Sequence, residues 1–168
     1  LSAFLYGEKH QDRRAVSSFL LKRGLFLVAL EFTLVNFAWT FQFPPQVIYL
    51  QVIWAIGLSM LALSALLWLP RPALIVLGLV IIGGHNLLDP LQFSADSALH
   101  VPWAILHDRG WIEVSENLRL RTSYPLLPWI GVIALGYAVG PWFARNADPE
   151  RRQRYLGGWA QGALLTFV

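Results

Sequence analysis

The sequence contains no cysteine and is poor in charge for its length. Without cysteine, a disulfide, a thiol nucleophile and a thiolate metal site are excluded. Charged residues make up 14% of the 168 residues, whereas a soluble domain usually carries about 25%. Apolar residues make up 56%, and the mean hydropathy is +0.51. This balance argues against a soluble domain and favours a chain embedded in a membrane.

Short motifs typical of soluble enzymes are also missing. No glycine-rich phosphate loop follows a strand-like stretch, and no Gly-x-Ser-x-Gly nucleophile elbow occurs. The four histidines have no shared ligand spacing, so the sequence predicts no metal site. The net charge of +3 would suit nucleic acid or anionic lipid. Most basic residues lie in short segments between apolar runs, which favours a membrane and no nucleic acid.

Long apolar runs indicate where the chain would cross a bilayer, because a membrane helix needs about 17–25 mostly apolar residues. Four runs meet or approach this length, and three of them contain no Asp, Glu, Lys or Arg. We therefore predict an all-α fold, a polytopic transmembrane helical bundle that forms a single membrane domain over residues 1–168. The complete spans would be 25–41, 47–69, 73–88 and 125–144. Both ends look cut, with the tail of an earlier span at the start and a truncated span at 156–168.

The basic residues predict which side of the membrane each loop faces. Ten of the thirteen Lys and Arg fall in one alternating set of loops, and the other three are Arg109, Arg119 and Arg121. The positive-inside rule makes the ten cytoplasmic and places the long loop 89–124 outside. Within this loop, residues 97–107 suggest a short interfacial helix, against which Pro102 argues. The alternation over 111–114 and 118–121 predicts a small hairpin.

Polar side chains within the apolar runs are the candidate site residues, because such groups are costly at membrane depth. His85 and Asp89 are four residues apart and would share one helix face. A carboxylate there can orient the imidazole and raise its basicity. By position, the polar groups of the first three spans converge on one level that opens to the outside. These candidates are Glu31, Asn36, Gln51, His85, Asn86 and Asp89.

Most of these candidates also have a structural interpretation. Asn36 and Gln51 would serve as hydrogen-bonding contacts between helices. Asp89, which precedes a proline, would be a helix-end residue, and His85 would donate to a backbone carbonyl. For Glu31 the sequence leaves two states open, a neutral carboxyl or a partner cation on another helix.

Five stretches, in order along the chain, resemble one protein family. They are Ser-Ala-Phe-Leu-Tyr-Gly at 2–7, Arg-Gly-Leu-Phe-Leu-Val-Ala-Leu-Glu at 23–31, Leu-Gln-Val-Ile-Trp-Ala-Ile-Gly at 50–57, Gly-His-Asn-Leu-Leu-Asp at 84–89, and Tyr-Pro-Leu-Leu-Pro-Trp-Ile-Gly-Val at 124–132. Together they resemble the heparan-α-glucosaminide N-acetyltransferase-like membrane proteins of bacteria, across nearly the whole chain. The resemblance implies an integral protein of the bacterial inner membrane, with its basic loops in the cytoplasm.

The resemblance also implies an activity. Such a membrane-bound acyltransferase takes acetyl-CoA from the cytoplasmic side and delivers the acetyl group to an amino sugar on the far side. His85 would be the base and Asp89 would orient it, while the basic loops would attract the phosphates of CoA. The family's proposed catalytic histidine lies upstream of the stretch at 2–7, so no residue here inherits that role. Substrate contacts would come from Asn36, Gln51, Asn86, Glu31 and Tyr124.

Two other classes of function stay open at this point. A transporter or flippase-like carrier would use the same polar residues without acyl chemistry, and a structural membrane subunit would use them only to join helices. For the enzyme, the predicted partners are membrane lipids, a small-molecule acyl donor and a sugar-like acceptor. A homo-oligomer is left open, and neither a metal nor nucleic acid is expected.

Overall fold

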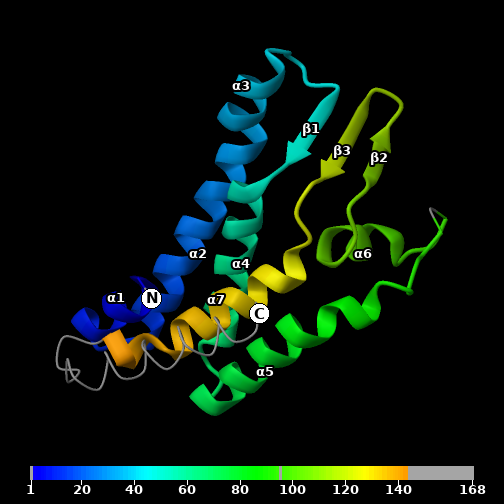
Figure 1. Cartoon of the computed structure of the whole chain (residues 1–168). Helices are drawn as coiled ribbons and strands as arrows, with labels where there is room; N and C mark the ends of the chain where they lie inside the picture. The colour runs from blue at the N-terminus through cyan, green and yellow to red at the C-terminus, as the bar shows by residue number, and fades with distance from the viewer. Residues whose placement is uncertain (1, 95, 144–168) are drawn as a thin grey trace, which may run out of the picture.

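The computed structural model, which describes residues 2–94 and 96–143, packs helices around a small three-stranded sheet (Figure 1). A π-helical turn (Glu31–Val35) joins two of the helices, and 3-10 turns (His85–Leu88 and Gly140–Phe143) follow two others. The helices are α1 (Ser2–His10), α2 (Arg13–Leu30), α3 (Asn36–Thr40), α4 (Val52–Leu66), α5 (Arg71–Gly84), α6 (His100–Leu106) and α7 (Leu126–Ala138). The strands are β1 (Val47–Leu50), β2 (Trp111–Ser115) and β3 (Leu118–Thr122).

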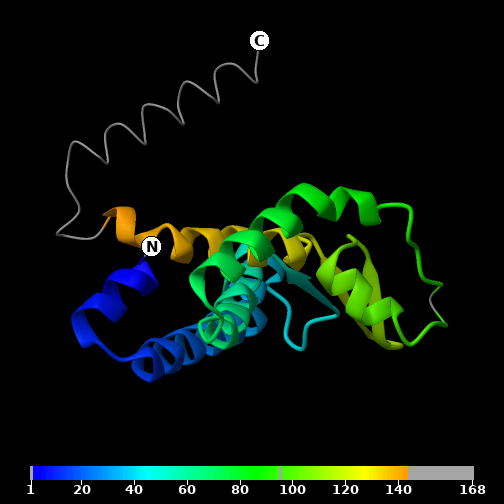
Figure 2. The same ribbon diagram turned by 90° about the horizontal axis from the view of Figure 1, so that it is seen from below.

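Two helix pairs form the body of the molecule. Helix α2 lies along α4, α5 lies along α7, and contacts between α4 and α7 join the pairs (Figures 1 and 2). Glycines allow the close approach within each pair. A Cβ on Gly57 would lie 2.9 Å from the carbonyl oxygen of Gly24, and one on Gly78 would lie 3.0 Å from that of Gly131. The two helices of each pair can therefore pack with their backbones in contact, as small residues permit at helix interfaces.

The sheet has the order β1-β3-β2 and joins distant parts of the chain. Strand β2 pairs antiparallel with β3, which confirms the predicted hairpin. Strand β1 pairs parallel with β3, and Ile48 lies opposite Leu120. The buried side chains Ile48 and Leu50 of β1 then pack with Trp54 and Ala55 of α4 in one apolar cluster. The sheet thereby attaches the segment 89–124 to the helices.

The predicted all-α polytopic bundle with four complete spans is wrong. The fold is mixed α/β, and within residues 2–94 and 96–143 one helix, Arg71–Leu88, is long and apolar enough to cross a membrane. Val52–Leu66 and Leu126–Ala138 are apolar but shorter. The expected span 47–69 fails because its first four residues form β1 and its helix begins after Gln51.

Other predicted boundaries also change for identifiable reasons. The apolar run 25–41 is the second half of a helical stretch that begins at Arg13, where the Asp12 side chain accepts a hydrogen bond from the backbone amide of Arg14. The expected span 125–144 is helical from Leu126 to Ala138 and then continues as a 3-10 turn. The truncated span predicted at 156–168 lies outside the described residues.

Candidate functional site

A hollow of about 380 Å³ lies where the end of α5 meets α6, and ionisable side chains gather in it. The sequence-predicted His85, Asn86 and Asp89 all line this hollow. They come together because α5 tightens into a 3-10 turn at His85–Leu88, just before Pro90. The polar and aromatic side chains of its lining are His85, Asn86, Asp89, Gln92, Trp103, His107, Asp108 and Arg109.

The local hydrogen bond of His85 sets which ring nitrogen is basic. Its Nδ1 lies 2.9 Å from the backbone oxygen of Ile82. Because a carbonyl oxygen can only accept, Nδ1 carries the proton, and the neutral ring keeps its lone pair on Nε2. The predicted contact with a carbonyl is therefore confirmed, and it leaves Nε2 of a half-buried imidazole as the proton acceptor.

Asp89 bonds to a different histidine from the one predicted. Its Oδ1 lies 3.0 Å from Nε2 of His107, which is 18 residues further along the chain. The Asp89 side chain is 66% exposed, whereas the His107 side chain is 8% exposed. His85 meets His107 ring edge to ring face, with the ring centroids 6.5 Å apart. The carboxylate therefore bonds to His107, and the bond of the His85 ring is to the backbone.

Helix α6 brings His107 to the hollow. Pro102 lies in the first turn of this helix, where the missing amide costs no hydrogen bond, so the helix forms despite it. The Trp103 ring packs against the ring of His107 at 4.9 Å between centroids. Phe93 in turn meets Trp103 edge to face at 5.3 Å. Aromatic contacts thus hold the His107 ring from one side.

The remaining polar candidates form a second group, at the junction of α2, β1 and α4. Glu31 is 0% exposed, and its Oε2 accepts a hydrogen bond of 3.1 Å from the backbone amide of Trp54. Trp54 is in the first turn of α4, whose N-cap residue, Gln51, provides no side-chain cap. Asn36 is 2% exposed, and its Oδ1 accepts from the backbone amide of Tyr49 at 3.1 Å. Glu31 and Asn36 therefore satisfy backbone amides of neighbouring elements.

Burial raises the pKa of the Glu31 carboxyl above its ordinary value of 4.5, because desolvation penalises the charged form. Hydrogen bonds from the backbone amides of Trp54 and Gln51 oppose this rise in pKa without cancelling it. The other carboxyl oxygen, Oε1, is buried and has no hydrogen-bond partner among the described residues. Burial thus shifts the Glu31 carboxyl toward its neutral form relative to a carboxyl in water.

The two polar groups are separate, although one apolar cluster touches both. Neither Glu31, Asn36 nor Gln51 lines the hollow of His85. Tyr124 packs against the buried cluster that contains Trp54, and its ring meets Trp129 edge to face at 6.2 Å. Ile105, two residues before His107, packs against the same cluster. The convergence of all predicted site residues on one pocket is therefore not observed.

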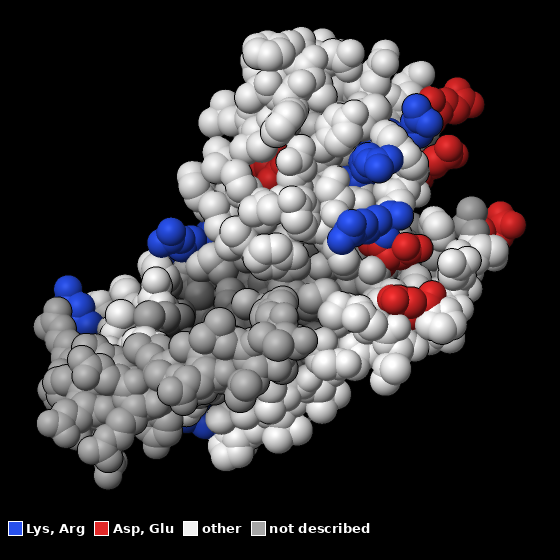
Figure 3. Space-filling view, viewed as in Figure 1, with Lys and Arg blue, Asp and Glu red and all other residues white. Residues whose placement is uncertain are grey.

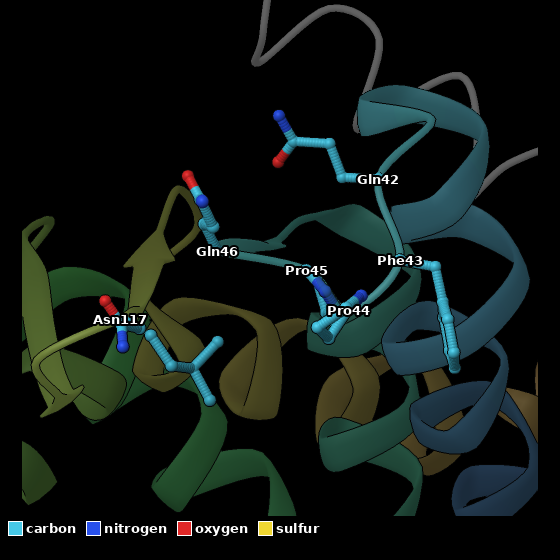
Figure 4. A pocket seen from close by; sticks show the side chains of 7 residues that line it. Gln42, Phe43, Pro44, Pro45, Gln46 and Asn117 are labelled. Atoms are coloured by element: carbon cyan, nitrogen blue, oxygen red, sulfur yellow. The ribbon is translucent and has the colours of Figure 1, made fainter.

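A second hollow, of about 820 Å³, lies between the turn after α3 and the tip of the hairpin (Figure 4). Figure 4 shows that the amide groups of Gln42, Gln46 and Asn117 spread apart and that the Phe43 ring lies toward the neighbouring helix. No group of three or more His, Asp or Glu that could hold a metal ion occurs in the described part of the chain. The 820 Å³ hollow therefore lacks the convergent polar groups of the first.

A third hollow, of about 650 Å³, lies between α1 and α2 and carries basic side chains. Tyr6 and Phe19 stack there at 4.4 Å between ring centroids, and Arg23 lies over the Phe19 ring at 5.9 Å. Lys22 lines the same hollow. In Figure 3, the Asp and Glu side chains of the visible face gather mostly at the other side of the molecule, over the hairpin and α6. Lys and Arg side chains lie among them, so this side carries charges of both signs, and the basic hollow lies away from it.

The residues of α6 and of the segment just after it were not predicted from the sequence to line the hollow. His107, Trp103 and Arg109 carry no pattern that links them to His85, because the pairing spans a loop. The sequence did contain the seven-residue spacing of His100 and His107, but His100 bonds instead to the backbone oxygen of Phe93, at 3.2 Å. Spacing alone therefore did not distinguish the two histidines.

One comparison with known proteins gives a match. A family model described as "Heparan-alpha-glucosaminide N-acetyltransferase, catalytic" matches residues 3–167, nearly the whole chain. No curated protein and no solved structure matches the chain.

Proposed function

The chain belongs to the heparan-α-glucosaminide N-acetyltransferase catalytic-domain family, and we propose that it transfers acetyl from acetyl-CoA to the amine of a sugar-like acceptor. The family match carries the reaction class, which is acetyl transfer, and thereby favours an enzyme over a carrier. The hollow of His85 supports the acceptor site, because it combines a proton acceptor with exposed polar groups beside an aromatic wall.

The proposed chemistry assigns one step to His85. The acceptor nitrogen attacks the carbonyl carbon of the thioester, the carbon–sulfur bond breaks, and CoA leaves as the thiolate. The proton of the attacking amine passes to Nε2 of His85, whose Nδ1 is engaged by Ile82. Asn86, exposed at the rim of the same hollow, is proposed as a contact for the acceptor. Substrate contacts of Gln51 and Tyr124 stay predictions.

The proposal leaves out Glu31 and Asn36 as substrate contacts. Both side chains are buried, and each already accepts a hydrogen bond from a backbone amide. Moving either toward a ligand would leave that amide unpaired, at a cost of about 1–3 kcal/mol.

For the donor we propose the basic hollow between α1 and α2. Lys22 and Arg23 would attract the phosphates of acetyl-CoA, as basic clefts do for anionic substrates. Helices α1 and α6 lie at opposite ends of the molecule in both views (Figures 1 and 2). The direct attack described above therefore requires the thioester of acetyl-CoA to extend from the basic hollow to the hollow of His85.

We also propose a location in the bacterial inner membrane, with the basic α1–α2 end in the cytoplasm. The family is membrane-associated, and the helix Arg71–Leu88 has the length and composition of a span. Large apolar side chains of α2, α3 and α5 are more than half exposed, among them Phe26, Trp39 and Val80. Apolar surface on this scale needs a covering, which lipid would supply.

The test of the catalytic assignment is His85→Ala in the protein purified with any chain that precedes or follows these residues. We expect kcat to fall by about 100-fold, since general base catalysis contributes about 100- to 10,000-fold. The thermal midpoint should change little, because His85 makes a single local hydrogen bond. His100→Ala is the matched control, because the His100 ring also bonds to a nearby backbone oxygen but does not line the hollow of His85. Unchanged turnover of His85→Ala would reassign His85 to packing.

A further inference from the structure

The pair formed by Asp89 and His107 is not explained by the chemistry assigned to His85. The carboxylate belongs to the turn after α5 and the imidazole follows α6, and they meet at 3.0 Å across the hollow's lining. The imidazole is buried while the carboxylate faces water, with side chains 8% and 66% exposed. The exposed member of the pair is therefore the one that a ligand can reach.

The polar contacts of His107 show which atom donates in its hydrogen bond with Asp89. A carboxylate only accepts, so Nε2 of His107 donates the hydrogen bond to Oδ1 of Asp89. The other ring nitrogen, Nδ1, is buried and has no partner among the described residues. The bond to Asp89 is thus the polar contact of the ring, and the tilted Trp103 ring, 4.9 Å away between centroids, restrains the His107 ring from one side. His107 is a rigid donor behind a solvent-facing carboxylate.

The charges around the hollow favour a cation at that carboxylate. Asp89 and Asp108 line the hollow with Arg109 as the one basic counterpart among its described lining residues. In the described part of the chain, the ion pair of Asp89 is with His107, and Arg109 does not pair with it. One oxygen of Asp89 is held by His107, which leaves the other for a ligand's N–H donors.

We propose that His107 is a positioning residue that holds the Asp89 carboxylate toward the protonated amine of the acceptor. The inference rests on the proposed function for the identity of the acceptor. Asp89 would bind the ammonium group and so select an amine over a hydroxyl. The ammonium then releases one proton to water, because only the free amine has a lone pair for attack, and His85 removes the second proton, which is lost during attack. A free carboxylate on a turn would have to be ordered during binding, and the bond from His107 removes that cost.

The experiment measures kinetics and binding with glucosamine and glucose as probes. His107→Leu removes the donor, and we expect it to raise KM for glucosamine by about tenfold with little change in kcat, because hydrogen bonds to charged groups contribute on this scale. His107→Gln keeps an N–H donor and should restore most of the wild-type KM. Asp89→Asn should raise KM similarly, and adding His107→Leu to it should raise KM no further. His100→Leu, on the same helix but outside the hollow's lining, is the control and should leave KM unchanged.

Calorimetric binding without acetyl-CoA separates this inference from the proposed function. The wild type should bind glucosamine better than glucose, and His107→Leu should lose that preference even if no acetyl transfer is detected. A purely structural role of His107 would lower the thermal midpoint of His107→Leu while the preference persisted, and this would overturn the inference. Equal KM values for wild type, His107→Leu and Asp89→Asn would also overturn it, with acetyl transfer intact.

Discussion

Glu31 illustrates at the residue scale how a buried carboxyl serves a helix to which it does not belong. Helix α4 begins without a side-chain cap of its own, and Glu31 supplies an acceptor from across the helix pair. The acceptor satisfies one of the amides that every helix leaves unpaired in its first turn. The interaction links the π-helical turn after α2 to the start of α4, so it contributes to the joint between them.

Two substitutions of Glu31 distinguish its role as a hydrogen-bond acceptor from the effect of its charge. Glu31→Ala leaves the Trp54 amide buried without a partner and should lower stability by about 1–3 kcal/mol relative to Glu31→Gln. Glu31→Gln keeps an acceptor oxygen and should fold normally. The measurement is thermal unfolding in detergent micelles, and equal midpoints for the two variants would show that the hydrogen bond contributes nothing.

The same residue predicts a pH dependence. Burial raises the folded-state pKa of Glu31 above 4.5, so the unfolded chain releases this proton first as the pH rises. The contribution of Glu31 to stability is therefore complete below about pH 4.5 and is lost as the pH rises toward the folded-state pKa. Against Glu31→Gln, the wild type should lose stability over this window, and parallel pH profiles of the two proteins would contradict the assignment.

The sequence predicted part of the candidate site at this scale. His85, Asn86 and Asp89 are close in the chain, and helical spacing was sufficient to place them together. His107 could not be found in the same way, because its pairing with Asp89 depends on how a loop folds back over 18 residues. The predicted partner of Asp89 was His85, but that ring is already oriented by the Ile82 carbonyl.

At the scale of elements, the apolar runs predicted where helices lie but not where each helix begins and ends. Residues 47–50 are Val-Ile-Tyr-Leu, a β-branched and aromatic stretch that suits a strand as well as a helix. The segment forms a strand because β1 pairs with β3. Strand β3 lies about 70 residues further along the chain, so local sequence periodicity cannot predict this pairing. The hairpin 111–121 was predictable because its two strands are adjacent and alternate.

The contact between α2 and α4 gives the prediction for this scale. Gly57→Ala would place a Cβ 2.9 Å from the Gly24 carbonyl oxygen, so the helices would have to separate. We expect a loss of about 1–3 kcal/mol, as for overpacking in a core, and a lower thermal midpoint. Gly83→Ala is the matched control, because nothing lies within 4 Å of a Cβ there. Its midpoint should stay equal or rise, since alanine favours a helix interior over glycine. Equal effects of both substitutions would show that the close approach is unimportant.

At the scale of the whole molecule, the family was predicted correctly and the fold class was not. Five ordered stretches indicated the acetyltransferase family, and the match over residues 3–167 confirms it. The fold class was wrong because apolar length was equated with a membrane span, although Arg71–Leu88 is the helix that meets this criterion among the described residues. The family was predicted from sequence stretches that occur in the same order as in the family, and this does not depend on helix length. The number of membrane spans was predicted from the length of each apolar run, which does.

The central claim is that this protein transfers acetyl from acetyl-CoA to an amine. The most direct measurement incubates the purified protein, with any flanking chain and in lipid vesicles, with glucosamine and acetyl-CoA that carries an isotopically labelled acetyl group. Mass spectrometry should show the label on the sugar nitrogen, together with an equal amount of free CoA thiol. Glucosamine without label, together with no calorimetric binding of acetyl-CoA, would contradict the account.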